Sequence, residues 1–124
     1  MSQHIIMSIE EDGSSSLETA PAPKFDDAGF PDGWKGMALE ASGVFMFMFE
    51  IAEGAVEFPV HSSEDEWLAY VVSGSGTLYA GTAEMERTDG VEYSEGDFIT
   101  FQGDTPHGWK AAGEPSRILF VKQA

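Results

Sequence analysis

Short apolar runs separated by glycine, proline and acidic turn residues recur along this chain from residue 35 to residue 122. Several runs alternate in side-chain character with the period of two that a strand requires, and none extends into a convincing helical pattern. We expect strands at residues 35–39, 44–51, 55–63, 67–73, 76–80, 84–87, 91–93, 97–101, 109–112 and 117–122. The pattern predicts an all-β fold, either a sandwich or a barrel.

Residues 44–51 are the most strongly patterned of these runs. Phenylalanine and isoleucine occupy the odd positions from 45 to 51, and valine and methionine occupy the even positions from 44 to 48. Successive side chains of a strand point to opposite faces, so both faces of this strand are apolar. We therefore expect it to be covered on both sides.

The composition excludes several classes of function. The chain has no cysteine, which rules out disulfides, thiolate metal sites and a cysteine nucleophile. It carries 22 acidic against 6 basic residues, a formal net charge of −16. Such a field repels phosphates and anionic lipids, so we expect neither a nucleic-acid partner nor a membrane partner. No leader-like or membrane-spanning run is seen, and we expect a cytoplasmic protein.

The chain divides into two parts by composition. Residues 1–24 are expected to form an N-terminal arm, with a short strand at residues 4–9 and a linker rich in Ser, Pro and Ala at residues 11–24. Residues 25–124 are expected to form one domain, which is a common size for a single hydrophobic core.

Two stretches carry the residues best suited to chemistry. Residues 54–74 hold His61, and residues 96–109 hold His107, each after a glycine and an apolar run. Imidazole is both an acid–base group near neutral pH and a common metal ligand. If the two strand ends converge, these side chains define one site.

The two stretches resemble the motifs of the cupin superfamily, whose members are jelly-roll barrels, also called double-stranded β-helices. The first family motif places Gly, His, His, Glu and Gly at set intervals. Counting back from Gly74, His61 matches the first histidine, Ser63 stands at the second histidine, and Trp67 stands at the glutamate. Gly54 lies one residue further from His61 than the motif asks.

The second family motif places Gly, Pro, Gly, His and Asn at set intervals. Gly96 and His107 match it, whereas Gln102, Asp104 and Ala111 replace the proline, the second glycine and the asparagine. The resemblance covers about residues 40–122. It implies a cupin-type jelly-roll barrel with only half of the usual three-histidine, one-carboxylate metal site.

The resemblance and the residues leave open two functional interpretations of the site, beside a purely structural role in which the backbone satisfies both imidazoles. In the first, His61 and His107 bind a divalent metal such as Zn, Ni, Fe or Mn, and Glu57 or Glu66 serves as a further ligand or a general base. In the second, the site is a metal-free pocket in which the imidazoles orient a ligand. Its walls are then expected to include Trp67, Trp109, Ser63, Phe47 and Tyr70.

Three functions follow from these interpretations. The first is binding of a small polar or aromatic molecule in the barrel, with or without a metal. The second is a metal-dependent isomerase, lyase or dioxygenase acting on a sugar or organic acid. The third is a dimerising scaffold without chemistry. If His61 points inward, Val56, Phe58 and Val60 are expected to point outward, and this row together with the resemblance favours a homodimer.

Overall fold

Eleven strands and no helix make up residues 2–124, the part of the chain that this computed structural model describes. The strands are β1 (Gln3–Ile9), β2 (Ser15–Pro21), β3 (Trp34–Ala41), β4 (Val44–Ile51), β5 (Phe58–His61), β6 (Trp67–Ser73), β7 (Ser75–Gly81), β8 (Arg87–Ser94), β9 (Phe98–Phe101), β10 (His107–Ala111) and β11 (Ser116–Gln123). The predicted all-β fold is confirmed. Within residues 2–124 there is no helix long and apolar enough to cross a membrane.

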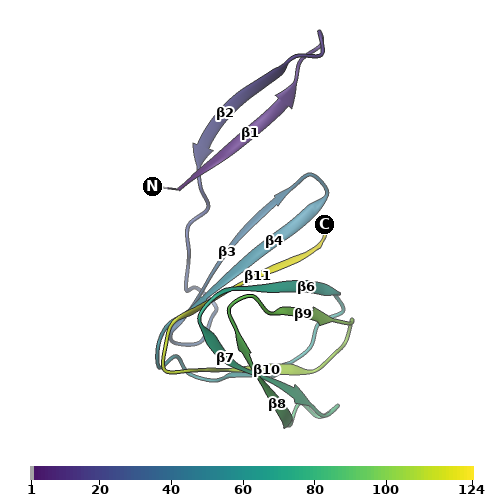
Figure 1. The fold of residues 1–124 in the computed structure, drawn as a ribbon. Coiled ribbons are helices and arrows are strands. Elements are labelled where there is room, and N and C mark those ends of the chain that lie inside the picture. The colour runs from purple at the N-terminus through teal and green to yellow at the C-terminus, as the bar shows by residue number, and fades with distance from the viewer. Residues whose placement is uncertain (1) are drawn as a thin grey trace.

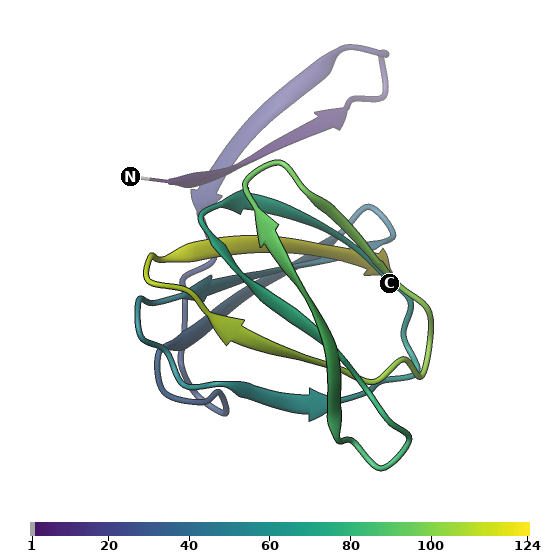
Figure 2. The same cartoon turned by 60° about the horizontal axis from the view of Figure 1, so that its bottom comes forward.

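Two antiparallel sheets enclose the core (Figures 1 and 2). One has five strands in the order β3-β4-β11-β6-β9, and the other has four in the order β5-β10-β7-β8. Strands distant in sequence are therefore neighbours, as in β4 beside β11 and β5 beside β10. These crossovers bring the two histidine stretches onto adjacent strands.

The core lies between the inner faces of the two sheets. Its fully or almost fully buried apolar side chains come from both sheets: Trp34, Ile51, Ala69, Val71, Tyr93, Phe101, Trp109, Ile118 and Phe120. The indole nitrogen Nε1 of Trp34 donates a hydrogen bond to the carbonyl oxygen of Val56 at 2.7 Å. A buried indole N–H needs such a partner, because an unpaired buried donor is costly.

Strand β4 is covered on one side only. Its odd-numbered phenylalanines face the core side, where they pack against Phe120 of β11 and against one another. On the opposite face Val44 and Met46 are exposed. The sequence predicts cover on both faces, and a single chain supplies it on one.

The N-terminal segment forms a β-hairpin of its own. Strands β1 and β2 pair antiparallel in full register from Gln3–Pro21 to Ile9–Ser15. In Figure 1 this hairpin projects away from the barrel. The first strand agrees closely with the predicted one, whereas β2 lies in the segment expected to be a linker, because composition alone does not reveal a pairing partner.

A bulge in β5 changes which side chains face the core. His61 pairs with His107, and Phe58 pairs with Trp109, so three steps along β5 match two along β10. The extra residue puts both Phe58 and His61 on the inner side, where their rings lie 4.9 Å apart between centroids. The predicted outward row is therefore wrong at Phe58, which packs on Trp34 at 5.1 Å between ring centroids.

Candidate functional site: an aromatic pocket with two histidines

A cavity of about 300 Å³ opens between the two sheets. Aromatic side chains make up most of its wall, and its lining residues are Phe30, Phe45, Phe47, Phe49, His61, Ser63, Asp65, Trp67, Phe101, His107, Trp109 and Phe120. This volume is at the lower end of the range of about 300–1,000 Å³ that is usual for small-molecule sites. The size and the lining of the cavity fit a small, largely apolar ligand.

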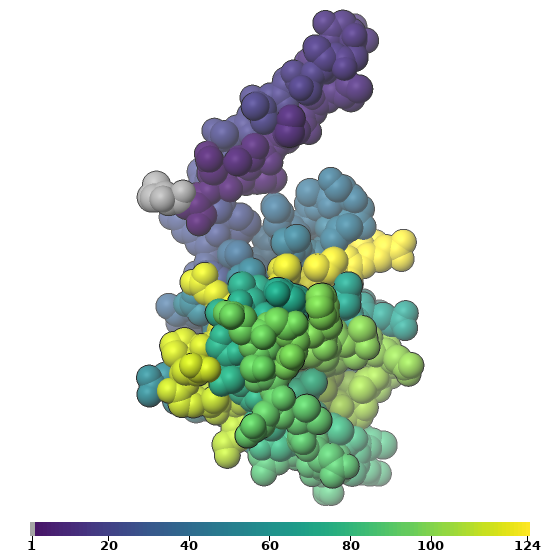
Figure 3. All heavy atoms as spheres, viewed as in Figure 1, coloured from purple at the N-terminus to yellow at the C-terminus, as the bar shows by residue number. Residues whose placement is uncertain are grey.

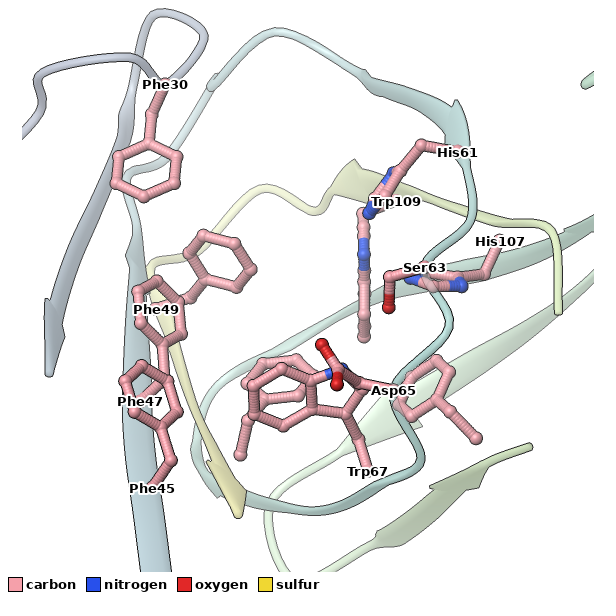
Figure 4. A pocket seen from close by; sticks show the side chains of 12 residues that line it. Phe30, Phe45, Phe47, Phe49, His61, Ser63, Asp65, Trp67, His107 and Trp109 are labelled. Atoms are coloured by element: carbon pink, nitrogen blue, oxygen red, sulfur yellow. The ribbon is translucent and has the colours of Figure 1, made fainter. Parts of the chain in front are cut away.

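The two ends of the pocket differ in chemistry (Figure 4). Phe30, Phe49, Phe47 and Phe45 line one wall along β4 and the loop before β3, and the two imidazoles lie on the opposite side. The alternation of β4 places three of these phenylalanines on one face. A ligand held here meets aromatic faces at one end and nitrogen atoms at the other.

His61 and His107 are in direct contact. They pair across the β5–β10 ladder, and their ring centroids are 4.4 Å apart with a tilted, edge-on geometry. Each ring also touches an aromatic side chain of the wall: His61 contacts Phe58, and His107 contacts Phe101 at 4.7 Å between centroids. The predicted convergence of the two histidines is thus observed in the structure.

Hydrogen bonds to the backbone fix the tautomer and the orientation of each neutral imidazole ring. The Nδ1 atom of His61 lies 3.0 Å from the carbonyl oxygen of Pro59, and the Nδ1 atom of His107 lies 2.8 Å from that of Thr105. A carbonyl oxygen can only accept, so each Nδ1 must carry the proton. In the neutral ring Nε2 is then an acceptor. The pair offers the pocket two hydrogen-bond acceptors.

The environment of His107 favours its neutral form. Burial lowers the pKa of His107 from its ordinary value of 6.5, the neighbouring His61 lowers it further, and the hydrogen bond to Thr105 opposes both effects. At neutral pH the Nε2 atom of His107 is therefore unprotonated and available as an acceptor or a base.

Two polar side chains complete the lining of the pocket. Ser63 and Asp65 follow β5 and line the pocket, as Figure 4 shows. The Asp65 carboxylate pairs with the Lys122 ammonium at 3.1 Å. Lys122 also lies over the Trp67 ring at 5.4 Å from its centroid. The cation neutralises the one carboxylate among the lining residues.

Four of the five predicted pocket residues meet in this cavity together with both histidines, and three predicted residues lie elsewhere. Phe47, Ser63, Trp67 and Trp109 line the cavity with His61 and His107. Tyr70 packs against Phe98 on the outer face of the five-stranded sheet, because it has the opposite alternation from Trp67 and is 38% exposed.

The two predicted carboxylates also lie outside the cavity. Glu57 precedes the bulge in β5, so it does not share the inner face with His61, and it forms a surface ion pair with Arg87. Glu66 lies beside a separate shallow depression next to Thr100 and Gln102. The expectation that Glu57 or Glu66 stands beside the histidines is corrected here.

The donor set does not fit a metal centre of the usual kind. Residues 2–124 contain no group of three or more His, Cys, Asp or Glu side chains placed to hold a metal ion. His61 and His107 supply two nitrogen ligands, whereas protein sites for zinc and similar metals use three or four protein ligands. The positions that would complete the cupin motif hold Ser63 and Trp67, neither of which is a strong ligand.

Several lining residues were not identified from the sequence. Phe101 and Phe120 lie in predicted strands, but the strand order that points them at His107 and Trp67 is not encoded locally. Asp65 belongs to a run of three acidic residues, 64–66, and the sequence gives no signal for which of them faces the cavity. Phe30 comes from a loop whose path depends on the bridge between Asp26 and Gly36.

The two packed sheets and the aromatic pocket between them define an all-β barrel protein. The family model described as "Cupin domain" matches residues 47–122. The chain therefore belongs to the cupin family, and the predicted jelly-roll fold is confirmed. No curated protein matches the chain.

Solved structures share this fold at low sequence identity. The polyketide cyclase RemF from Streptomyces resistomycificus has a TM-score of 0.68 and 23% identity, over 82% of this chain and 73% of that one. The cupin domain of Schizosaccharomyces pombe Cnp3 has a TM-score of 0.70 and 12% identity, over 100% of this chain and 88% of that one.

A longer chain, that of an enzyme, contains a region with a similar fold. The oxalate decarboxylase of Lactobacillus farciminis has a TM-score of 0.66 and 16% identity, over 82% of this chain. The matched region is only 30% of the decarboxylase chain. At these identities the likeness establishes the fold, and fold alone does not assign a reaction.

Proposed function

We propose that this cupin binds a small, flat, largely apolar molecule carrying a hydroxyl group, and that it needs no metal to do so. The ligand's rings lie between Trp67 and the phenylalanines of β4, and its hydroxyl donates a hydrogen bond to an imidazole Nε2. The observation that carries the proposal is the fixed orientation of the two histidines, whose Nδ1 atoms are both engaged by backbone carbonyls.

The charge of the site supports a neutral ligand over an anionic one. The two imidazoles present acceptors rather than donors when neutral, and burial holds the pKa of His107 down. Lys122, a cation beside the lining, is already paired with Asp65. The net charge of −16 adds a repulsive field for an anion.

Three compounds of similar size separate these contributions. Calorimetric titration is carried out with 2-naphthol, which has a hydroxyl donor, 2-methoxynaphthalene, which lacks it, and 2-naphthoate, which is an anion. We expect 2-naphthol to bind at least about tenfold more tightly than the other two, since the lost hydrogen bond leaves a buried acceptor unpaired. Equal binding of all three, or tightest binding of the naphthoate, contradicts the proposal.

Two further measurements test whether Trp67 contributes to binding and whether binding needs a metal. Trp67→Ala is expected to weaken 2-naphthol binding, whereas Phe98→Ala, on the outer face of the same sheet, is expected to leave it unchanged. Protein stripped with a chelator is expected to bind as well as untreated protein. Binding that appears only after a divalent metal is added favours the metal-dependent function instead.

Proton transfer is a second candidate function, favoured by the contact between His61 and His107. A neutral Nε2 atom takes a proton from one atom of the bound ligand, and the imidazolium so formed returns that proton to a different atom of the ligand, directly or through the Nε2 atom of the adjacent ring, which is acid–base catalysis of an isomerisation. In 2H2O, the protein is expected to speed deuterium exchange at the carbon between the hydroxyls of 1,3-dihydroxynaphthalene. The variant His107→Gln is expected to bind this compound without accelerating the exchange.

A further inference from the structure

We propose that Lys122 determines the charge class of the ligands that the cavity accepts. Its ammonium group occupies a cation-binding cage beside the cavity, and this resident cation keeps organic ammonium ions out. Without that ammonium, the same cage becomes a site for a small quaternary ammonium ion. Charge selection at this cage goes beyond the function proposed above, and it does not depend on a hydrogen bond to the imidazoles.

Strand alternation directs Lys122 toward the inner side of the sheet. In β11 every second side chain from Ser116 to Phe120 is buried, and Lys122 continues this series. The Lys122 side chain is 25% exposed, so its ammonium lies at the border between the core and solvent. In Figure 3 the end of β11, in yellow, reaches the surface beside the blue residues of the β3–β4 hairpin. Lysine is rarely found in such a position unless its charge is paired.

Aromatic rings from the strands on either side of β11 flank the ammonium. Lys122 pairs in register with Phe45 of β4, and the strand on its other side is β6, which begins at Trp67. The Nζ atom lies 5.5 Å from the centroid of the Phe45 ring and 5.4 Å from that of the Trp67 ring. Both distances are within the range of about 6 Å over which a ring face attracts a cation.

A carboxylate completes the cage. Asp65, in the loop after β5, places its Oδ1 atom 3.1 Å from the Nζ atom of the lysine. Its neighbours Glu64 and Glu66 are exposed, whereas Asp65 is half-buried and lines the cavity with Phe45 and Trp67. Aromatic rings around a cation are the usual protein site for a quaternary ammonium group, and an adjacent carboxylate adds charge attraction. Here these groups surround the chain's own lysine.

Two other cation–ring contacts within residues 2–124 have a different arrangement. Arg87 lies over the single ring of Tyr79, and Arg117 lies over that of Phe25. These four residues are not among those that line the cavity. Lys122 lies over two rings that do line it, so its contacts bear directly on what the cavity accepts.

An occupied cage is closed to a second cation. Like charges a few ångströms apart repel one another, and its tether to the backbone gives the lysine a high effective concentration at the cage. An ammonium ligand must therefore displace Lys122 from Asp65 and from both rings before it can bind. A neutral ligand meets no such repulsion.

Two compounds of the same shape test the proposal. Choline carries a quaternary nitrogen, and 3,3-dimethylbutan-1-ol has a carbon atom in its place, whereas both have the same hydroxyl group. Any contact of that hydroxyl with the imidazoles cancels in the comparison, so a failure here is distinct from a failure of the proposed function. In calorimetric titrations at physiological ionic strength, we expect Lys122→Ala to bind choline at least about tenfold more tightly than the wild type does. The same variant is expected to prefer choline over the neutral alcohol by at least about tenfold.

Three further variants separate the cage from the net charge of the chain. Lys110→Ala removes the same charge from an exposed position of β10, and it is expected to bind choline no better than the wild type. Lys122→Arg keeps a cation in the cage and is also expected to show no gain. Addition of Asp65→Asn to Lys122→Ala is expected to remove most of the gain. Equal choline affinity of the wild type and Lys122→Ala overturns the proposal, as does an equal gain in Lys110→Ala or equal binding of choline and the alcohol.

Proton NMR of the wild-type chain supplies a readout that requires no variant to fold. The faces of aromatic rings shield nearby protons, so the ε-methylene protons of Lys122 are expected upfield of those of the exposed Lys110. Coincident shifts for the two lysines mean that the ammonium of Lys122 does not occupy the cage, and they overturn the proposal.

Discussion

The rings of His61 and His107 lie 4.4 Å apart between centroids, from two strands that are neighbours in the sheet and far apart in the sequence. Each ring donates its Nδ1 proton to a carbonyl two residues earlier in its own strand or loop. The backbone thus selects the same tautomer of the neutral ring twice, which leaves both Nε2 atoms as acceptors.

The first prediction concerns the pH dependence of stability. The pKa of His107 is lowered in the folded state, mainly by burial, so the unfolded chain binds its proton more readily. The contribution of His107 to stability is complete above its ordinary pKa of 6.5 and is lost as the pH falls below that value toward the folded pKa.

This contribution is isolated by comparison with His107→Gln, because the 22 acidic residues of the chain add their own pH dependence. We expect the free energy of unfolding, measured with urea, to fall by more between pH 7.5 and pH 5.5 in the wild type than in the variant. A loss of the same size in both proteins contradicts the assignment to His107.

The second prediction restores the metal ligands of the cupin motif. Ser63 and Trp67 line the same cavity as His61 and His107. The double variant Ser63→His with Trp67→Glu is expected to bind Co²⁺ or Zn²⁺ at least about a hundredfold more tightly than the wild type, because it raises the ligand number from two to four. Visible absorption of Co²⁺ reports both affinity and geometry. Unchanged affinity means that the two positions do not converge with the imidazoles.

The third prediction separates stability from binding at two tryptophans. Trp109 is 1% exposed and packs edge-on against Tyr93 and Phe120. Trp109→Ala is expected to cost about 3–5 kcal/mol of unfolding free energy through the cavity it leaves. Trp67→Ala, at a partly exposed position, is expected to cost less unfolding free energy while weakening the binding of 2-naphthol. Chemical denaturation and calorimetry measure the two effects, and an equal stability cost contradicts the difference in burial.

The fourth prediction uses two glycines with similar backbone angles. Gly74 has φ +76° and Gly54 has φ +73°, but a Cβ atom at Gly74 would lie 2.6 Å from the Cα of Ser116, whereas open space surrounds Gly54. Both alanine variants incur the cost of a left-handed conformation, about 1 kcal/mol. Gly74→Ala is expected to be destabilised further by about 1–3 kcal/mol because of the overlap. Equal unfolding midpoints for the two variants contradict this.

Much of the fold is predictable from local pattern. The alternation in residues 44–51 gives the inner and outer faces of β4, and glycine and acidic turns delimit β6 and β9 closely. The partner of β1 is not predictable in this way. Residues 15–21 have the composition of a linker, and they form β2 because their backbone pairs with β1 in register.

The site is partly predictable for a similar reason. The spacing of the cupin motifs identifies His61 and His107, and it places Ser63 and Trp67 beside them. Period-two reasoning fails at Glu57 because the bulge in β5 adds one residue, and no sequence signal marks it. The predicted division of the chain at residue 24 stays a prediction, as do the homodimer and the cytoplasmic location.

Phe30 lines the pocket, and the short segment before it leads from the hairpin, anchored to β3 by the bridge between Asp26 and Gly36. The hairpin and one wall of the cavity are therefore carried by the same stretch of backbone. If joining of two copies moves that stretch, occupancy of the cavity and self-association become thermodynamically linked. Linkage is reciprocal. If the ligand changes the dissociation constant of the dimer by some factor, dimerisation must change the dissociation constant of the ligand by the same factor.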